Sequence, residues 1–291
     1  MFPIRANSRL SPDVSLLVIE APRVARHRLP GQFCIVRPTS RSERIPLTIA
    51  DVDAEKGTVT LIVQAVGATT RDLCALPAGQ CISDLVGPLG KPTEIDRWGH
   101  VVLVGGGVGT AVIFPQAAAL RNAGNRVTAV IGGRSRPYVI LEEPLRGCCD
   151  AVFPCTDDGS YGYHGFVTGK LQALLAETVN PVNAVFAAGP PPMMRAVAEL
   201  TRPYGVRTIV SLNPIMVDGT GMCGGCRVTV GGQMRFACVD GPEFDGHAVD
   251  FAELIDRLTT YRDHERRAAE RAAHECRLNA AARPCEDSHE R

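Results

Sequence analysis

A hydrophobic strand that runs directly into a glycine-rich turn places the strongest constraint on how this chain folds. Residues 101–104 read VVLV, which is typical of a buried strand, and residues 105–109 read GGGVG, before a helical segment at about 111–123. Glycines let a backbone approach a pyrophosphate closely, and the N-terminus of the following helix favours an anion. A tight turn without a ligand is the alternative, but the order of strand, turn and helix favours a nucleotide site. The residues predicted to form it are Gly105, Gly106, Gly107, Gly109 and Thr110.

Strands and helices alternate after this turn. Further strands are expected at residues 127–131, 151–153, 184–188 and 208–212, and helices at about residues 139–145, 169–176 and 192–201. Such alternation indicates a parallel sheet with helices on both faces. Residues 98–212 are therefore predicted to form an α/β nucleotide-binding domain.

The residues before this domain follow a different pattern. Segments 14–20 and 58–66 are dense in Val, Leu and Ile, and Pro and Gly punctuate the sequence between such runs. Short strands at this spacing are typical of a small antiparallel barrel. We predict that residues 1–97 form this barrel.

Three of the eleven cysteines form a spaced group. Cys223, Cys226 and Cys238 follow the pattern C-x2-C-x11-C within the glycine-rich segment 213–250. An ordinary zinc finger would require a second close pair or histidines. Glycines let a loop wrap closely around a metal centre with its N–H groups directed at sulfur. The spacing predicts a metal centre, and a structural zinc with Asp218 or His247 as a fourth ligand remains an alternative to an iron–sulfur cluster.

Charge and hydropathy exclude several kinds of partner. Lys and Arg together number 31, as do Asp and Glu, so the chain offers no electrostatic case for nucleic acid or an anionic membrane. The longest apolar runs are too short to cross a bilayer. Residues 1–22 lack the long apolar core of a signal peptide, which predicts a cytoplasmic protein.

The C-terminal region, residues 251–291, is expected to begin with a helix. Phe251, Leu254, Ile255 and Leu258 recur at the spacing of an amphipathic helix. Residues 262–291 carry many charges and almost no large apolar residue, so they are predicted to be a solvated helix or disordered.

Several motifs resemble the ferredoxin–NADP reductase superfamily, and they occur in that family's order. Residues 44–48 read RIPLT, residues 66–71 read VGATTR, residues 87–90 read GPLG, and residues 188–194 read AGPPPMM. The resemblance covers roughly residues 10–250. It implies a β barrel that binds FAD, followed by an α/β domain that binds a nicotinamide nucleotide.

The same resemblance implies roles for individual residues. The arginine of RIPLT contacts the flavin pyrophosphate, a task for which a guanidinium is well suited, and the threonine lies beside the isoalloxazine. The expected FAD contacts are Arg44, Pro46, Leu47, Thr48, Gly67, Thr69 and Thr70. Beyond the glycine turn, the expected nucleotide contacts are Arg134, Asp157, Gly189, Pro190 and Met193, the last three bringing nicotinamide against flavin.

The choice between NAD and NADP stays open at this stage. The second strand of the α/β domain ends in IGGRSR instead of the usual acidic residue that holds a ribose. Arg134 and Arg136 could meet an adenosine 2′-phosphate or could be solvated loop residues. NAD(H) is favoured because it is the nucleotide used at this subunit by the family that the cysteine segment resembles.

The cysteine segment resembles the 2Fe–2S loop of the dihydroorotate dehydrogenase electron-transfer subunit. That family has a cysteine where this chain has Asp218. The same substitution marks a sister group, the small (alpha) subunit of NADH-dependent ferredoxin–NADP oxidoreductase, also called sulfide dehydrogenase. We therefore expect Asp218, Cys223, Cys226 and Cys238 to hold one 2Fe–2S cluster.

This second resemblance implies an electron-transferring flavoprotein subunit with no catalytic acid or base. Electrons would pass between NAD(P)H, FAD and the cluster, and then to or from a larger partner flavoprotein with iron–sulfur clusters, similar to the glutamate synthase small subunit. Ferredoxin would be reached through that complex, which could bifurcate electrons. The alternatives are an electron-transfer subunit of a dihydroorotate dehydrogenase and a non-redox nucleotide-binding module with a structural metal.

Overall fold

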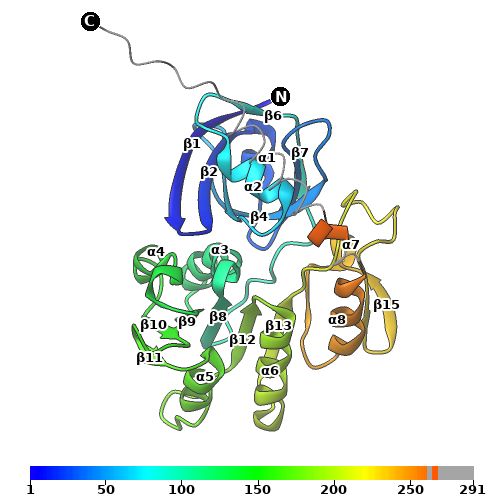
Figure 1. Ribbon diagram of the computed structural model, residues 1–291. Coiled ribbons are helices and arrows are strands. Elements are labelled where there is room, and N and C mark those ends of the chain that lie inside the picture. The colour runs from blue at the N-terminus through cyan, green and yellow to red at the C-terminus, as the bar shows by residue number, and fades with distance from the viewer. Residues whose placement is uncertain (261–263, 268–291) are drawn as a thin grey trace, which may run out of the picture.

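The computed structural model describes residues 1–260 and 264–267. An antiparallel barrel at the top of Figure 1 stands on a parallel sheet with helices on both sides. A third, smaller part, yellow to orange in the figure, lies beside the sheet. Most of the predicted tail at 262–291 lies outside the described residues. Cys276 and Cys285 both lie outside them.

The N-terminal part is a curled antiparallel sheet, as the strand spacing predicts. Its strand order is β6-β1-β2-β5-β4-β3-β7, so the two end strands are neighbours in sequence and the sheet nearly closes on itself. Side chains of alternate residues, such as Leu17, Ile19, Val59, Leu61 and Val63, fill its interior. The elements are β1 (Phe2–Ser11), β2 (Val14–Glu20), α1 (Pro22–His27), β3 (Phe33–Arg37), β4 (Ile45–Asp53), β5 (Thr58–Gln64), α2 (Ala68–Ala75), β6 (Cys81–Ile82) and β7 (Asp84–Leu89).

The second part is the predicted parallel sheet, in the order β11-β10-β9-β8-β12-β13, with β16 added antiparallel at the edge. Its strands are β8 (His100–Gly106), β9 (Arg126–Gly133), β10 (Ala151–Thr156), β11 (Tyr163–His164), β12 (Ala184–Ala188), β13 (Arg207–Ser211) and β16 (Glu243–Asp245). The order reverses between β8 and β12. Loops that leave neighbouring strands in opposite directions open a crevice at the carboxyl edge there, where ligands bind in open α/β sheets.

Helices cover both faces of this sheet, also as predicted. Val101 and Leu103 of β8 pack with one set of helices, whereas Val102 and Val104 pack with the other. The first set comprises α3 (Thr110–Asn122) and α4 (Glu142–Arg146), and the second comprises α5 (Val167–Leu175) and α6 (Pro191–Thr201). Short 3₁₀ turns are η1 (Gly107–Gly109), η2 (Arg136–Tyr138) and η3 (Arg202–Tyr204).

The helix predicted at 139–145 is wrong over its first half. Leu141 has a left-handed backbone with φ of 59°, and the helix begins only after it, at Glu142. Ile140 is drawn instead into a cluster with Val14, Ala50 and Ile62 of the barrel. Packing between the two parts of the molecule therefore overrides the local pattern.

The third part contains a hairpin and two helices. Its elements are β14 (Arg227–Val230), β15 (Gln233–Phe236), α7 (Ala237–Asp240) and α8 (Phe251–Thr259). The hairpin turn uses Gly231 and Gly232, both at positive φ. Helix α8 is the predicted amphipathic helix; it buries Phe251 and Leu254, and the Asp250 carboxylate caps it by accepting the Glu253 N–H at 2.9 Å. No helix within residues 1–260 and 264–267 is long and apolar enough to span a membrane.

Candidate functional site

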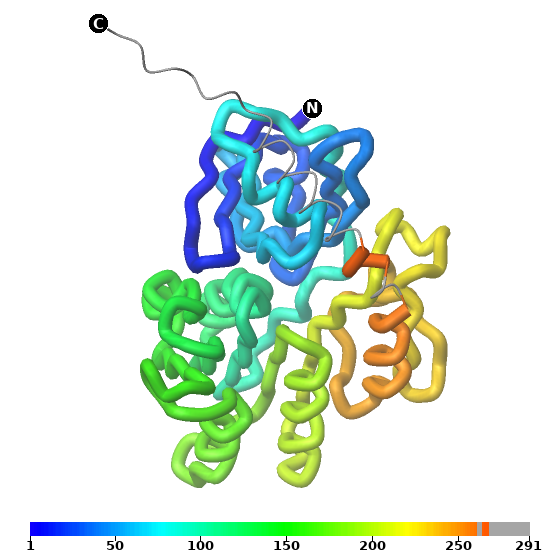
Figure 2. The backbone as a smooth tube through the Cα atoms, viewed as in Figure 1, coloured from blue at the N-terminus to red at the C-terminus, as the bar shows by residue number. Residues whose placement is uncertain are grey.

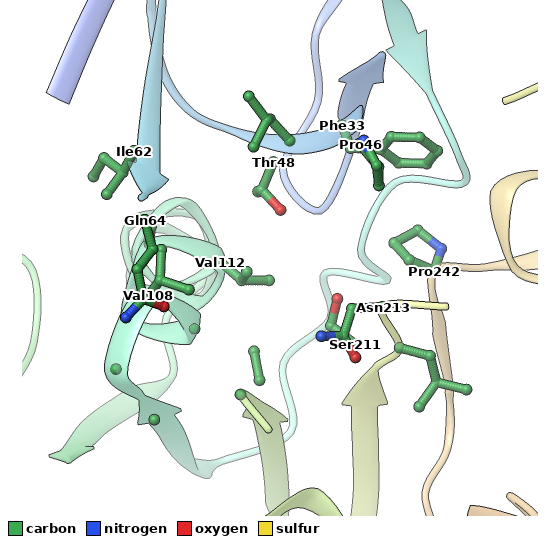
Figure 3. A pocket seen from close by; sticks show the side chains of 18 of the residues that line it. Phe33, Pro46, Thr48, Ile62, Gln64, Val108, Val112, Ser211, Asn213 and Pro242 are labelled. Carbon is green, nitrogen blue, oxygen red and sulfur yellow. The ribbon is translucent and has the colours of Figure 1, made fainter. Parts of the chain in front are cut away.

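A cavity of about 450 Å³ lies where the barrel meets the carboxyl edge of the parallel sheet. Figure 3 shows Thr48 and Pro46 approaching it from the barrel, with Val108 and Ser211 on the side of the sheet. Loops after β8, β12 and β13 form its lower wall, so it occupies the crevice created by the reversal of strand order. The third part also contributes to the wall, through Met216 and Pro242.

The predicted glycine turn forms part of this wall, and its glycines serve different purposes. A Cβ atom on Gly109 would collide with the backbone carbonyl of Ala188, and one on Gly106 would collide with the Met193 sulfur. These two glycines are needed for close packing of neighbouring loops. Gly107 has φ of 55° and open space around it, so its backbone is the part of the turn that is free to meet a ligand.

The residues predicted to contact FAD divide into two groups. Pro46, Leu47 and Thr48 line the cavity, whereas Arg44, Gly67, Thr69 and Thr70 lie outside its lining. Arg44 donates from Nε to the carbonyl of Val217 at 2.7 Å, which ties the barrel to the third part. The Thr70 hydroxyl accepts the N–H groups of Val66 and Gly67 at 3.0 and 2.9 Å, which shapes the N-terminal turn of α2.

A second cavity, of about 820 Å³, adjoins the first along the carboxyl ends of β9 and β10. The two cavities share Gln64, Gly106, Gly107, Val108 and Pro190 in their walls. Of the nucleotide contacts expected beyond the glycine turn, four line the second cavity: Arg134, Asp157, Pro190 and Met193. Gly189 lines the first cavity.

Two charged residues that line this second cavity, Arg134 and Asp13, are paired with each other. The Arg134 guanidinium stacks 3.7 Å from the centre of the Tyr138 ring and lies 3.8 Å from the Asp13 carboxylate. Asp13 is held in place by the Ser11 hydroxyl at 3.0 Å and the Gln64 amide at 2.9 Å. Sequence reasoning missed Asp13, Gln64 and Tyr138, because no local pattern shows that the β1–β2 turn reaches across to the sheet.

The structure brings two of the four predicted cluster ligands together. The Sγ atoms of Cys226 and Cys238 are 3.1 Å apart and buried, whereas Cys223 is exposed. Within the described residues, no set of three or more metal-binding side chains is gathered. Both carboxylate oxygens of Asp218 accept backbone N–H groups, from Thr220 at 3.0 Å and from Cys223 at 2.8 Å. These bonds hold the pKa of Asp218 below its usual range, and they make Asp218 a cap of the cysteine loop.

The donor set nevertheless fits a thiolate-bound centre. Burial, followed by the neighbouring Cys226, raises the pKa of Cys238 to about 12, so this thiol stays protonated at neutral pH unless a positive ion lies beside it. A metal ion supplies that charge and deprotonates coordinating thiols outright. Gly219, Gly221 and Gly224 have positive φ, which lets the loop that carries Cys223 fold back on itself.

Comparison with known proteins agrees with this organisation. The profile of the iron–sulfur cluster binding domain of dihydroorotate dehydrogenase B matches residues 213–250. A chain from the structure of NADH-dependent reduced ferredoxin–NADP oxidoreductase is 45% identical, with a TM-score of 0.88, over 93% of this chain and 97% of that one. A cytochrome P450 reductase from Amycolatopsis, 19% identical with a TM-score of 0.56 over 69% of this chain and 65% of that one, shares the fold alone. The fold is therefore of the ferredoxin-reductase class, as the resemblance implies.

Relatives in sequence define the family more narrowly. A Thermotoga maritima protein named as a homologue of the electron-transfer subunit of dihydroorotate dehydrogenase B is 47% identical over 90% of this chain and 92% of its own length. The electron-transfer subunit of dihydroorotate dehydrogenase B from Shouchella clausii is 36% identical over 78% of this chain and 89% of its own. The chain belongs to the family of dihydroorotate dehydrogenase B electron-transfer subunits and their homologues. An electron-transfer role thus replaces the alternative of a non-redox module.

Proposed function

We propose that this chain binds FAD in the cavity beneath the barrel, a nicotinamide nucleotide in the adjoining cavity and one 2Fe–2S cluster at the cysteine segment. The observation that supports this most directly is that the first cavity has walls from all three parts of the chain. It shares Gly107 and Gln64 with the second cavity, and the cluster segment supplies Met216 and Pro242 to it. An electron carrier in this cavity would therefore lie between a hydride donor and the cluster.

The chain's own residues bind and position the groups. FAD supplies the chemistry of accepting two electrons together and releasing them singly. Thr48 and the free backbone of Gly107 face the cavity, and the apolar side chains around them exclude water. Cys226 and Cys238, joined by Cys223 and Asp218, would hold the cluster. No side chain is required to act as an acid or base.

We propose NAD(H) as the nucleotide. The adenosine 2′-phosphate of NADP would carry a negative charge into a cavity lined by Asp13 and Asp157. Arg134, which could have neutralised it, is already engaged by Asp13 and Tyr138. NADH should therefore bleach the flavin faster than NADPH in stopped-flow experiments, and faster bleaching by NADPH would contradict this assignment.

The proposed partner is a larger flavoprotein subunit with iron–sulfur clusters, similar to the glutamate synthase small subunit, with ferredoxin reached through the complex in the cytoplasm. Apolar side chains surround the cysteine loop at the surface: Met222 is 89% exposed, Val217 46% and Val239 43%. An exposed apolar patch at the exit point for electrons suits a protein partner. The relatives' names also allow a dihydroorotate dehydrogenase partner, and purification of the native complex would distinguish the two.

Analysis of the purified chain tests the proposal as a whole. We expect FAD and about two iron and two sulfide ions per chain. Addition of NADH should bleach the flavin and then reduce the cluster. Zinc without iron, or a colourless protein that does not take up FAD on reconstitution, would contradict the proposal.

A further inference from the structure

A carboxyl group joins three distant segments of the chain next to the first cavity. The Oε1 atom of Glu243 accepts hydrogen bonds from the Thr93 hydroxyl at 2.6 Å and from the Gln116 amide Nε2 at 2.5 Å. Glu243 begins β16, Thr93 belongs to the linker that leaves the barrel, and Gln116 lies on α3. Figure 2 shows this linker descending from the barrel between the parallel sheet and the yellow segment.

Glu243 is also a neighbour of the cavity wall. Pro242 precedes it in sequence and lines the cavity, and Ser211, its partner in the strand register, does the same. Gln116 lies one helical turn after Val112, another lining residue. Glu243 is therefore connected to the cavity wall through the chain at Pro242, the strand pairing with Ser211 and the helix that carries Gln116.

The hydrogen bonds around Glu243 are one donor short. Gln116 is 1% exposed, and its Oε1 atom has no hydrogen-bond partner among the described residues. Buried polar atoms are almost always satisfied, so this acceptor requires a donor. Oε1 of Glu243 already accepts the Gln116 amide N–H, and a proton on the other carboxyl oxygen would supply the donor that Gln116 lacks.

We propose that Glu243 is a positioning residue that carries a proton below neutral pH and, by pairing its neutral carboxyl with the Gln116 carboxamide, fixes the cluster segment against the flavin cavity. Burial acts in the same direction, because it raises the pKa of Glu243 to about 7 against the opposing effect of its two hydrogen-bond donors. Ionisation would leave a partly buried charge and an unsatisfied carbonyl at the junction of the three segments.

The charged groups on the surrounding elements do not neutralise Glu243. Glu94 of the linker pairs with Arg207 of β13 at 2.6 Å, and Arg121 of α3 pairs with Asp150. Lys91 of the linker is exposed, as is Asp245, which accepts the His247 N–H. Within residues 1–260 and 264–267, Glu243 makes no ion pair.

The first test uses the thermal unfolding of the full chain and needs no bound cofactor. The folded state holds the proton of Glu243 up to about pH 7, whereas the unfolded state releases it near the usual value of 4.5. The stability that this proton provides is therefore complete below about pH 4.5 and is lost as pH rises through about 7. Other groups also titrate in this range, so we expect the midpoint of the wild type to fall by roughly 5 °C relative to that of Glu243→Gln.

Three variants test whether the proton on the Glu243 carboxyl is what stabilises the folded state. Glu243→Gln carries a permanent donor to the Gln116 carbonyl, so its profile should lack the fall that the Glu243 proton causes. Glu243→Ala should be less stable at every pH. Glu177→Gln, at an exposed position, should keep the wild-type profile. A Glu243→Gln variant as unstable as Glu243→Ala, or one with the wild-type slope, would overturn the proposal.

Infrared spectroscopy and electron transfer provide the second test. The carbonyl-stretch band of a protonated carboxyl should be present at pH 6 and absent in Glu243→Gln. The electron-transfer part rests on the proposed function: after NADH reduces the flavin, cluster reduction should slow above pH 7 in the wild type but not in Glu243→Gln. Rates with the same pH profile in both would overturn the positioning role. A wild type without flavin or cluster would instead contradict the proposed function and leave the unfolding result intact.

Discussion

The cavities at the switch point and the cysteine segment are built in opposite ways. The cavities are formed by backbone turns and apolar packing, such as the close approach of Gly109 to Ala188. In the cysteine segment, the thiols of Cys226 and Cys238 are in contact and buried, whereas Cys223 is exposed. The proposed nucleotide sites are thus preorganised by the packing of the fold, whereas a metal would complete the proposed cluster site.

Replacing a buried cysteine of the cysteine segment should have the largest effect. That effect should be confined to the cluster and should not reach the flavin cavity. Cys226→Ser or Cys238→Ser should lose the cluster almost entirely, because a serine hydroxyl is a much poorer ligand for iron than a thiolate. FAD content should stay near one per chain, since neither cysteine lines the flavin cavity. Iron, sulfide and flavin analysis measures both, with Cys148→Ser as the control that should retain its iron. Loss of flavin together with iron would show that the two regions fold as one.

Arg44 tests the boundary between the two regions. If it binds the flavin pyrophosphate, Arg44→Ala should weaken FAD affinity by ~1.5–3 kcal/mol, the value of a charge-assisted hydrogen bond. Fluorescence titration of the deflavinated protein measures this, and Arg41→Ala at an exposed neighbouring position should leave affinity unchanged. Normal FAD affinity with reduced iron content would instead assign Arg44 to the cysteine loop, through its bond to Val217.

Asp218 tests whether the cluster has a carboxylate ligand. Asp218→Cys should keep the cluster but shift its reduction potential and electron paramagnetic resonance signal, because thiolate donates more electron density than carboxylate. An unchanged signal would mean that Asp218 acts only as the loop cap seen in its bonds to Thr220 and Cys223. Asp218→Asn keeps only one of the two accepting oxygens, so it should then retain the wild-type signal but hold the cluster less firmly.

The sequence predicts elements that follow from local patterns far better than elements that depend on tertiary contact. Alternating strands and helices are local patterns, and they correctly indicate the parallel sheet, the barrel and the glycine turn. The return of β16 to the sheet edge is not predictable, because residues 243–245 have no strand-like run and pair only through tertiary contact. Ile140 illustrates the same limit, since its position depends on barrel residues far away in sequence.

The smallest predicted effect concerns nucleotide choice and tests whether the second cavity is as preformed as its geometry indicates. Asp13→Asn removes the carboxylate beside Arg134 but keeps a group of the same shape for Ser11 and Gln64. The freed guanidinium, 63% exposed, could then meet a 2′-phosphate. An exposed ion pair contributes at most about 1 kcal/mol, so NADPH affinity should rise by roughly fivefold and NADH affinity should hardly change.

Equilibrium titration with the two nucleotides measures this, and Asp72→Asn on the barrel surface is the control. If NADH binding weakens instead, Asp13 holds a ribose hydroxyl directly, and discrimination in this cavity comes from recognition of NAD and not from exclusion of NADP.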